Sequence, residues 1–184
     1  MSQHMPKLGK NAKRFNTRTM SSKTIFDPFD ANRTFYQRIR NLVLNRMALN
    51  KMEQDFAHFK RKEFPDTAVD IYDDLLKAYK RRDKVELMRI LSAEYYDIFK
   101  SSIRDKKPLP GIKLYKKILK ASLVQSRTVA LKNSTDDADN FAQITMEFVF
   151  KDEETGDKLK KYNVFERKFT DKDEKDWRIC HLDQ

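Results

Sequence analysis

Cysteine, glycine and long apolar runs are scarce in this chain of 184 residues, and each scarcity excludes a class of protein. The single cysteine, Cys180, excludes an internal disulfide framework and fits a reducing compartment. Three glycines and five prolines exclude a fibrous or low-complexity chain, and no glycine-rich phosphate loop is present. Because no run of about 18 apolar residues occurs, the sequence predicts no membrane-spanning helix.

Residues for catalysis or metal binding are equally scarce. His4, His58 and His181 do not lie within metal-ligand spacing of one another or of Cys180, so we expect no metal and no cofactor. Cys180 and His181 are adjacent, but neighbouring residues of a strand point to opposite faces, which argues against a nucleophile–base pair. No nucleophile elbow or paired-carboxylate motif is present. We therefore expect a non-catalytic binding protein.

Positive charge is abundant, and it is concentrated near the N-terminus. The formal net charge is +11, of which residues 1–62 contribute +10, with 14 Lys and Arg against 4 Asp and Glu. No acidic residue precedes Asp27. Such asymmetry indicates a basic arm that binds a polyanion, attached to a nearly neutral domain. A second basic stretch, residues 100–120, favours either a polyanion-binding patch or a solvated face rich in lysine.

Three segments follow from the pattern of apolar residues. Residues 1–30 have no apolar periodicity and form a basic extended tail, which fits either a mitochondrial transit peptide or an arm that orders on RNA. Residues 31–62 predict a long basic amphipathic helix, which could bind RNA, lie on an anionic membrane or pack on the domain of residues 63–184. Its apolar stripe comprises Phe35, Ile39, Leu42, Leu49, Met52, Phe56 and Phe59.

Residues 63–184 predict helices first and strands afterwards. Pro65 marks the start of one helix, and Asp83 with Glu86 forms a capping box that opens another, with Val85, Met88 and Leu91 directed inward. After the Pro-Gly break at residues 108–111 the apolar period changes from 3.6 to 2. We predict strands over residues 114–131, 144–150, 158–169 and 177–182, hence an α+β fold with helices on one face of an antiparallel sheet.

Two segments resemble a known family. One is KEFPDTAVDIY over residues 62–72, and the other is YNVFERKF over residues 162–169, followed by WRI at residues 177–179. In their order they resemble the Tim-forty-four-like domain. This domain is shared by the matrix-side subunit of the inner-membrane protein translocase and the forty-five class of mitochondrial large ribosomal subunit proteins. The likeness spans residues 62–182 and is closer to the ribosomal class.

The resemblance implies a cone related to the nuclear-transport-factor-two-like fold: N-terminal helices on one face of a curved antiparallel sheet, preceded by the basic tail. It also implies a place in the mitochondrial matrix, near the polypeptide exit of the ribosome and facing the inner membrane. We therefore expect a structural component of the mitochondrial large ribosomal subunit. The expected RNA-binding residues are Lys10, Lys13, Arg14, Arg18, Arg38 and Arg46.

The expected partners are mitochondrial ribosomal RNA and neighbouring large-subunit proteins, with anionic inner-membrane lipid or an insertase as a further contact. The alternative is a peripheral inner-membrane adaptor of the protein-import or insertion machinery, similar to a ribosome receptor, whose basic helix binds anionic lipid. A third reading is a small cone enzyme or ligand carrier. It would need ionisable groups that converge in a pocket, whereas the predicted inward strand positions are mostly Ile, Met, Phe and Val.

Overall fold

The computed structural model describes residues 35–105, 107, 109, 113–115, 117–130, 140–152, 155–169 and 177–183. The predicted tail of residues 1–30 therefore lies outside the described residues. Within them helices precede strands, and the fold is α+β, as predicted. The elements are α1 (Phe35–Asp55), α2 (Phe64–Arg81), α3 (Lys84–Ile90), α4 (Ala93–Asp105), β1 (Lys117–Ala130), β2 (Asn140–Lys151), β3 (Lys158–Lys168) and β4 (Arg178–Leu182).

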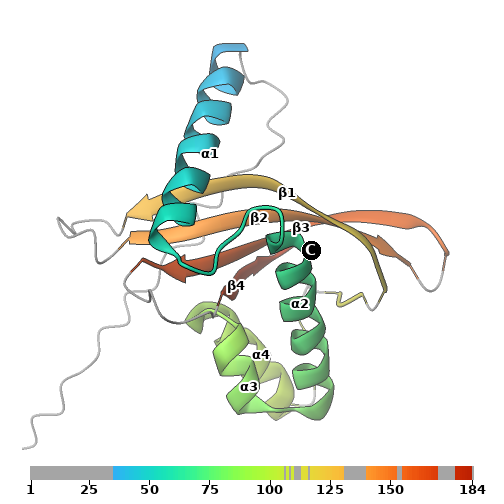
Figure 1. Ribbon diagram of the computed structural model, residues 1–184. Coiled ribbons are helices and arrows are strands. Elements are labelled where there is room, and N and C mark those ends of the chain that lie inside the picture. The colour runs from blue at the N-terminus through green and yellow to red at the C-terminus, as the bar shows by residue number, and fades with distance from the viewer. Residues whose placement is uncertain are drawn as a thin grey trace, which may run out of the picture.

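The four strands form one antiparallel sheet in the order β1-β2-β3-β4. Alternate residues of β2 are directed into the core, and Ile144, Met146, Phe148 and Phe150 are all buried, as their spacing predicted. The register between β1 and β2 shifts at two places. Such irregularities increase the twist and bend of a strand, and Figure 1 shows β1 and β2 as long curved arrows.

The helices pack against this sheet and share one core with it. In Figure 1, α2, α3 and α4 lie together below the sheet, and the C-terminal end of α1 crosses it near β1. At the opposite edge the chain between α3 and α4 is tied to β4, because the backbone N–H of Ser92 donates to the carbonyl of Ile179 at 2.9 Å. The sheet is thus held by helices at both of its edges.

The first helix is shorter than the sequence predicted. It ends at Asp55, and residues 56–63 form turns rather than a continuation to residue 62. The reason is aromatic packing: the ring of Phe56 stacks on Phe169 with centroids 5.0 Å apart, and Phe59 and Phe64 both pack against Trp177. The turns direct Phe56 and Phe59 into the core together, and both are buried.

Local signals set the starts of α2 and α3. Pro65 occupies the first turn of α2, and the carboxylate of Asp83 accepts hydrogen bonds from the backbone N–H groups of Val85 and Glu86 at the start of α3. Only this half of the predicted capping box forms, because the Glu86 carboxylate pairs with Arg89 and the Asp83 N–H donates to the carbonyl of Ala78.

The inward face predicted for α3 was only partly right. Leu91 is buried, but Val85 and Met88 are exposed, because the helix presents Leu87 and Ile90 to the core instead.

Candidate interaction surface

The C-terminal half of α1 is fastened to the sheet at Asn45. The backbone N–H of Ser126 in β1 donates to Asn45 Oδ1 at 2.7 Å, and the Ser126 hydroxyl donates to the Asn45 carbonyl oxygen at 2.9 Å. Ser126 is buried, so this contact satisfies polar groups that water does not reach. From Ala48 to Asp55 the helix buries its apolar side chains, which are Ala48, Leu49 and Met52.

The N-terminal half of α1 projects beyond the sheet and exposes apolar side chains instead. Figure 1 shows this blue-coloured half of the helix extending upward, away from the strands. In this half Leu42 is 68% exposed and Ile39 and Val43 are also exposed, and Met47, one turn further along α1, is 62% exposed. Ile39, Val43 and Met47 recur every four residues and share one side of the helix, away from the side that carries Asn45 to the sheet. Leu42, three residues before Asn45 and seven before Leu49, continues the sheet-facing row where the helix projects beyond the sheet. We call the four exposed residues the outward stripe.

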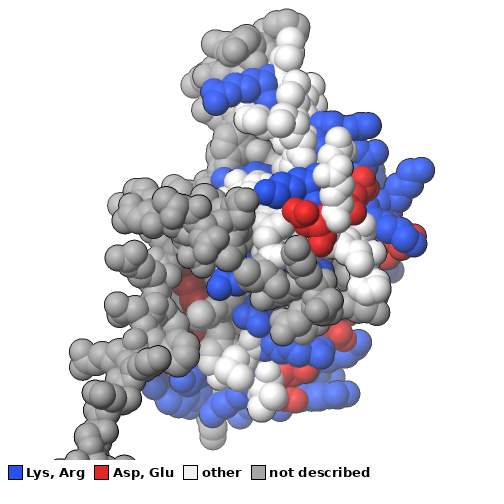
Figure 2. All heavy atoms as spheres, turned by 60° about the vertical axis from the view of Figure 1, so that its left-hand side comes forward, with Lys and Arg blue, Asp and Glu red and all other residues white. Residues whose placement is uncertain are grey.

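Basic side chains accompany the outward stripe. Arg40 and Arg46 are both exposed, and Arg46 lies within the stripe because it is three residues from Val43 and four from Leu42. In the upper part of Figure 2, blue Lys and Arg side chains lie next to white surface among the residues that the structure describes. An exposed apolar patch rimmed by cations is typical of a contact with a partner or a membrane surface.

Of the six residues predicted to bind RNA, the structure describes the side chain of one. Arg46 is exposed, and its contact with RNA stays a prediction. Arg38 lies in α1, but its side chain is not among those described. The others lie outside the described residues: Lys10, Lys13, Arg14 and Arg18.

The outward stripe itself was missed by the sequence analysis, which combined Ile39 and Leu42 with the buried Leu49 and Met52 as one stripe. The signal that could have separated them is the phase of the repeat. Ile39, Val43 and Met47 recur every four residues, out of phase with the inward row of Asn45, Leu49 and Met52. The helix is therefore apolar on two sides: Leu42, seven residues before Leu49, belongs to the predicted stripe, whereas the row that contains Val43 and Met47 was missed.

The second basic stretch, residues 100–120, is divided among α4, a loop and β1. Arg104 pairs with Asp105 at 2.8 Å, and Lys113 pairs with Asp152 at 3.4 Å. Lys100 lies over the Tyr96 ring at 5.8 Å. Part of its charge is thus matched within the chain, so the described residues favour a solvated face here more than a dedicated phosphate site.

The sheet surface between β1 and β4 carries a chain of polar side chains. The guanidinium of Arg127 donates to Gln143 Oε1 at 2.8 and 3.0 Å, and Gln143 Nε2 donates to Glu166 at 3.2 Å. Burial raises the pKa of Glu166 above its ordinary value and lowers the pKa of Arg127 below its own. The chain of hydrogen bonds keeps these charges satisfied, so we interpret it as structural.

Cys180 and His181 contact different partners. The Cys180 thiol donates to the carbonyl of Val164 at 3.5 Å, and burial raises its pKa well above the ordinary value. His181 Nδ1 lies 3.0 Å from the hydroxyl of Tyr95 in α4. Such a thiol is a poor nucleophile. Among the described residues no group of three or more His, Cys, Asp or Glu could hold a metal ion, and no helix is long and apolar enough to cross a membrane.

A comparison with protein families identifies the domain. The family model of the Tim44-like domain matches residues 45–184, a range that begins at the asparagine that fastens α1 to the sheet. No curated protein matches the chain. Tim44-like domains have a nuclear-transport-factor-two-like fold, in agreement with helices packed on an open antiparallel sheet. The domain is compatible with roles at the mitochondrial inner membrane.

Proposed function

We propose that this chain, which belongs to the Tim44-like domain family, is a structural component of the mitochondrial large ribosomal subunit that helps to hold translation at the inner membrane. In this proposal the protein is not an enzyme. The cone formed by the helices and the sheet packs on neighbouring ribosomal proteins, and the basic N-terminal region binds ribosomal RNA near the polypeptide exit. The observation that supports it is the combination of an N-terminal excess of positive charge with a projecting α1 whose Arg40 and Arg46 are exposed.

The charge distribution supports RNA as the partner of the N-terminal region. Residues 1–62 carry a net charge of +10, whereas the rest of the chain carries +1. Contacts between Lys or Arg and phosphate depend little on base sequence, and they release counterions from the nucleic acid. A protein that contacted only other proteins on a ribosome would not need this uneven distribution of charge. The excess of positive charge in residues 1–62 therefore favours contact between this region and RNA phosphates.

The projecting half of α1 supports a second contact beside the phosphates. Leu42 and Met47 expose more than half of their side-chain surface. A contact that covers them would bury apolar area worth about 25 cal/mol per Å². Because Arg46 lies in the same row, one surface can supply both apolar packing and a phosphate contact. A site on the ribosome where a protein surface adjoins RNA would offer an apolar area to the leucine and methionine and a phosphate to the arginine.

Neutralising the basic residues tests the proposal. The variant carries glutamine at Lys10, Lys13, Arg14, Arg18, Arg38 and Arg46. It should bind large ribosomal subunits more weakly in sedimentation assays, and the dependence of log K on log salt should become less steep by about 0.7 to 0.9 for each phosphate that the protein no longer neutralises. The matched control neutralises six exposed cations of the cone, namely Lys80, Arg81, Lys84, Lys151, Lys158 and Arg178. Equal weakening by both variants, or by neither, contradicts the proposal.

A second candidate function is supported by the exposure of the outward stripe. In it the protein is a peripheral inner-membrane adaptor of the import or insertion machinery, and α1 inserts Leu42, Val43 and Met47 into an anionic bilayer. Replacing all three by glutamine should abolish flotation with anionic vesicles. Val85 and Met88 provide a matched control, because they are 74% and 56% exposed on α3. Loss of flotation with unchanged ribosome binding in the stripe variant favours the adaptor over the ribosomal component.

A further inference from the structure

The corner where α2 ends and α3 begins is a second exposed surface, at the opposite end of the molecule from the projecting half of α1. Figure 1 shows that half of α1 above the sheet, and the junction of α2 and α3 at the lower end of these two helices, below the sheet. The corner combines basic and apolar side chains that are all exposed. We define the α2–α3 corner by six residues: Lys80, Arg81, Arg82, Lys84, Val85 and Met88.

Positive charge at the corner is not matched within the chain. The four cations of the corner stand against Asp83 alone, which gives residues 80–84 a net charge of +3. None of the four forms an ion pair with a residue that the structure describes. Their neighbours differ, because Lys77 pairs with Asp74 at 2.9 Å and Arg89 pairs with Glu86 at 2.7 Å. The corner therefore presents a local excess of positive charge to a partner.

Arg82 occupies a backbone conformation that favours glycine. Its φ is 58°, at the residue that caps the C-terminus of α2, and among the described residues no other non-glycine residue has a positive φ. Glycine adopts this left-handed conformation without steric cost, whereas a residue with a side chain does not. The arginine therefore keeps a cation at the corner in a position where glycine would suit the backbone better.

The apolar pair of the corner lies on the side of α3 that faces away from the core. Val85 is 74% exposed and Met88 is 56% exposed, and they are three residues apart on one side of the helix. With about 3.6 residues per turn, Lys84 and Arg89 lie on either side of this pair. Phosphates of RNA would match the cations but would leave Val85 and Met88 in water. The surface therefore fits a partner that is both anionic and apolar.

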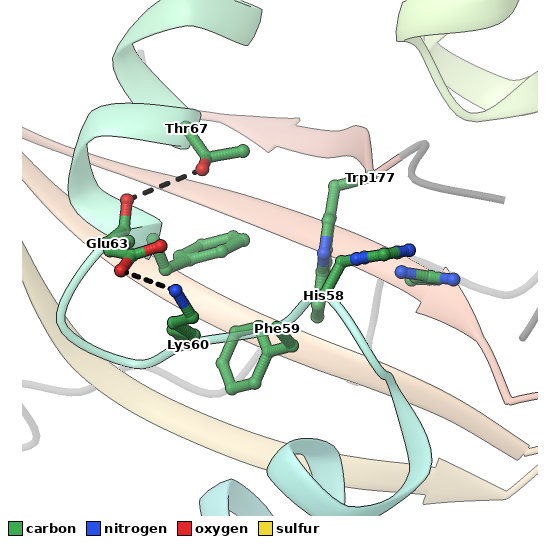
Figure 3. Close-up of a pocket in the computed structure, with 8 residues that line it drawn as sticks. His58, Phe59, Lys60, Glu63, Thr67 and Trp177 are labelled. Atoms are coloured by element: carbon green, nitrogen blue, oxygen red, sulfur yellow. Dashed lines mark hydrogen bonds and ion pairs between the residues drawn. The ribbon is translucent and has the colours of Figure 1, made fainter. Parts of the chain in front are cut away.

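The shape of the corner selects among such partners. A partner helix binds in a groove, whereas a junction of two helices protrudes. A pocket that the structure describes lies elsewhere, between the turns after α1, the start of α2 and the end of β3, and it encloses about 200 Å³. Figure 3 shows this pocket beside the ion pair of Lys60 and Glu63. A bilayer receives a protruding apolar tip without a matching groove, and its anionic headgroups attract Lys and Arg.

We propose that the α2–α3 corner docks on an anionic membrane surface. Val85 and Met88 enter the boundary between headgroups and acyl chains, and the four cations of the corner pair with lipid phosphates. This inference rests on the proposed function, in which the protein helps to hold translation at the inner membrane, and it names the surface that meets the bilayer. Because the corner and the projecting half of α1 lie at opposite ends, the membrane and the ribosome can be contacted at the same time. In the second candidate function α1 meets the bilayer instead.

Flotation of the full chain with vesicles tests the apolar pair. The vesicles contain equal parts of phosphatidylcholine and anionic phosphatidylglycerol. Replacing Val85 and Met88 together by glutamine should weaken binding at least about tenfold, because two side chains lose their apolar contact. Replacing Leu42, Val43 and Met47 by glutamine should not change it. Equal weakening by both variants overturns the proposal, and so does the reverse result, which favours the second candidate function.

Arg82→Gly tests the charge of the corner and keeps the fold. Glycine suits the left-handed conformation, so the melting temperature should not fall, whereas binding to the anionic vesicles should weaken about threefold to tenfold. Lys158→Gln, which removes an exposed cation of β3, is the matched control and should leave binding unchanged. Vesicles of phosphatidylcholine alone should bind more weakly and should not distinguish the variants. Equal binding of Arg82→Gly and the wild type to anionic vesicles contradicts the proposal.

A polarity-sensitive fluorophore separates the corner from the basic N-terminal region, which anionic lipid also attracts. The label is attached to Met88→Cys or to Met47→Cys, since burial raises the pKa of the Cys180 thiol and makes it a poor nucleophile. Anionic vesicles should shift the emission of the label at residue 88 to the blue and leave the label at residue 47 unchanged, and isolated large ribosomal subunits should do the opposite.

The two labels also distinguish failure of this inference from failure of the proposed function. A label at residue 88 that responds to ribosomal subunits and not to vesicles overturns the membrane contact and assigns the corner to the ribosome. A label at residue 88 that responds to vesicles, in a protein that does not bind ribosomal subunits, supports the membrane contact and contradicts the proposed ribosomal role.

Discussion

The two halves of α1 have similar apolar content but different surroundings. The C-terminal half buries Leu49 and Met52 against the sheet and is fixed by the contact between Asn45 and Ser126. The N-terminal half leaves Leu42 and Val43 exposed. The same kind of side chain thus serves folding in one half and is available for a partner in the other. The comparison shows that an apolar stripe predicts which side of a helix is in contact with something, but does not predict whether that contact is the protein's own sheet or a separate partner.

The largest contrast is expected in stability. Phe56 is fully buried and stacks on Phe169, so Phe56→Ala should lower the free energy of unfolding by about 3–5 kcal/mol. Leu42→Ala should change it by less than about 0.5 kcal/mol, because the side chain is exposed. Urea unfolding of both variants measures the difference. Similar losses in the two variants would mean that the outward stripe is part of the folding core.

The second contrast is in local opening of α1. Amides over residues 48–52 should exchange with solvent only through large-scale unfolding, whereas those over residues 39–44 should exchange through fraying of the projecting helix end. The two opening free energies should differ by at least about 3 kcal/mol. Hydrogen exchange read out by mass spectrometry measures both in one experiment. Addition of the partner that covers α1 should slow the exchange of residues 39–44. Equal protection of residues 39–44 and 48–52 in the free protein would show that the two halves of α1 do not differ in stability.

The boundary between the halves is expected at Asn45. Asn45→Ala removes the side-chain oxygen that accepts from the N–H and the hydroxyl of the buried Ser126, although the hydroxyl keeps the backbone carbonyl of residue 45, and it should cost about 1–3 kcal/mol. Ser126→Ala removes the hydroxyl but keeps the N–H bond, so it should cost less. A double-mutant cycle of the two should give a coupling energy of about 0.5–3 kcal/mol. Additive effects would show that the two residues do not fasten the helix together.

Much of the cone could be predicted because local rules decide it. Pro65 sets the start of α2, the Asp83 carboxylate sets the start of α3, and alternation sets the buried face of β2. Each of these signals acts between residues that are neighbours in the sequence or in one strand. The order of helices before strands then follows from where the period of apolar residues changes.

The features that could not be predicted depend on distant contacts. The end of α1 is set by the packing of Phe56 and Phe59 against Phe169 and Trp177, more than a hundred residues away. The inward face of α3 is ambiguous in the sequence, because seven residues are too few to fix a helical phase. The pocket likewise combines Arg167 with residues of the turns and α2, and no single segment shows that these residues meet.

The smallest expected effect is a pH dependence at the edge of the cone farthest from α1. His181 contacts Tyr95, and burial lowers the pKa of its imidazole below the ordinary value. The unfolded chain, with an imidazole pKa near about 6.5, therefore binds more protons than the folded one as the pH falls through that value. The contribution of His181 to the free energy of unfolding is present above this pH and decreases below it.

Glu166 acts in the opposite direction and must be separated from His181. Burial raises its pKa, so the folded chain binds the extra proton and gains stability as the pH falls toward the ordinary carboxyl range. Both effects occur in the wild type, whereas His181→Gln retains only the second. Between pH 7 and 5 the unfolding free energy of the wild type should therefore fall relative to that of His181→Gln. Parallel curves would mean that the contact between α4 and β4 does not depend on the neutral imidazole, and the pH response of the cone would then come from its carboxylates.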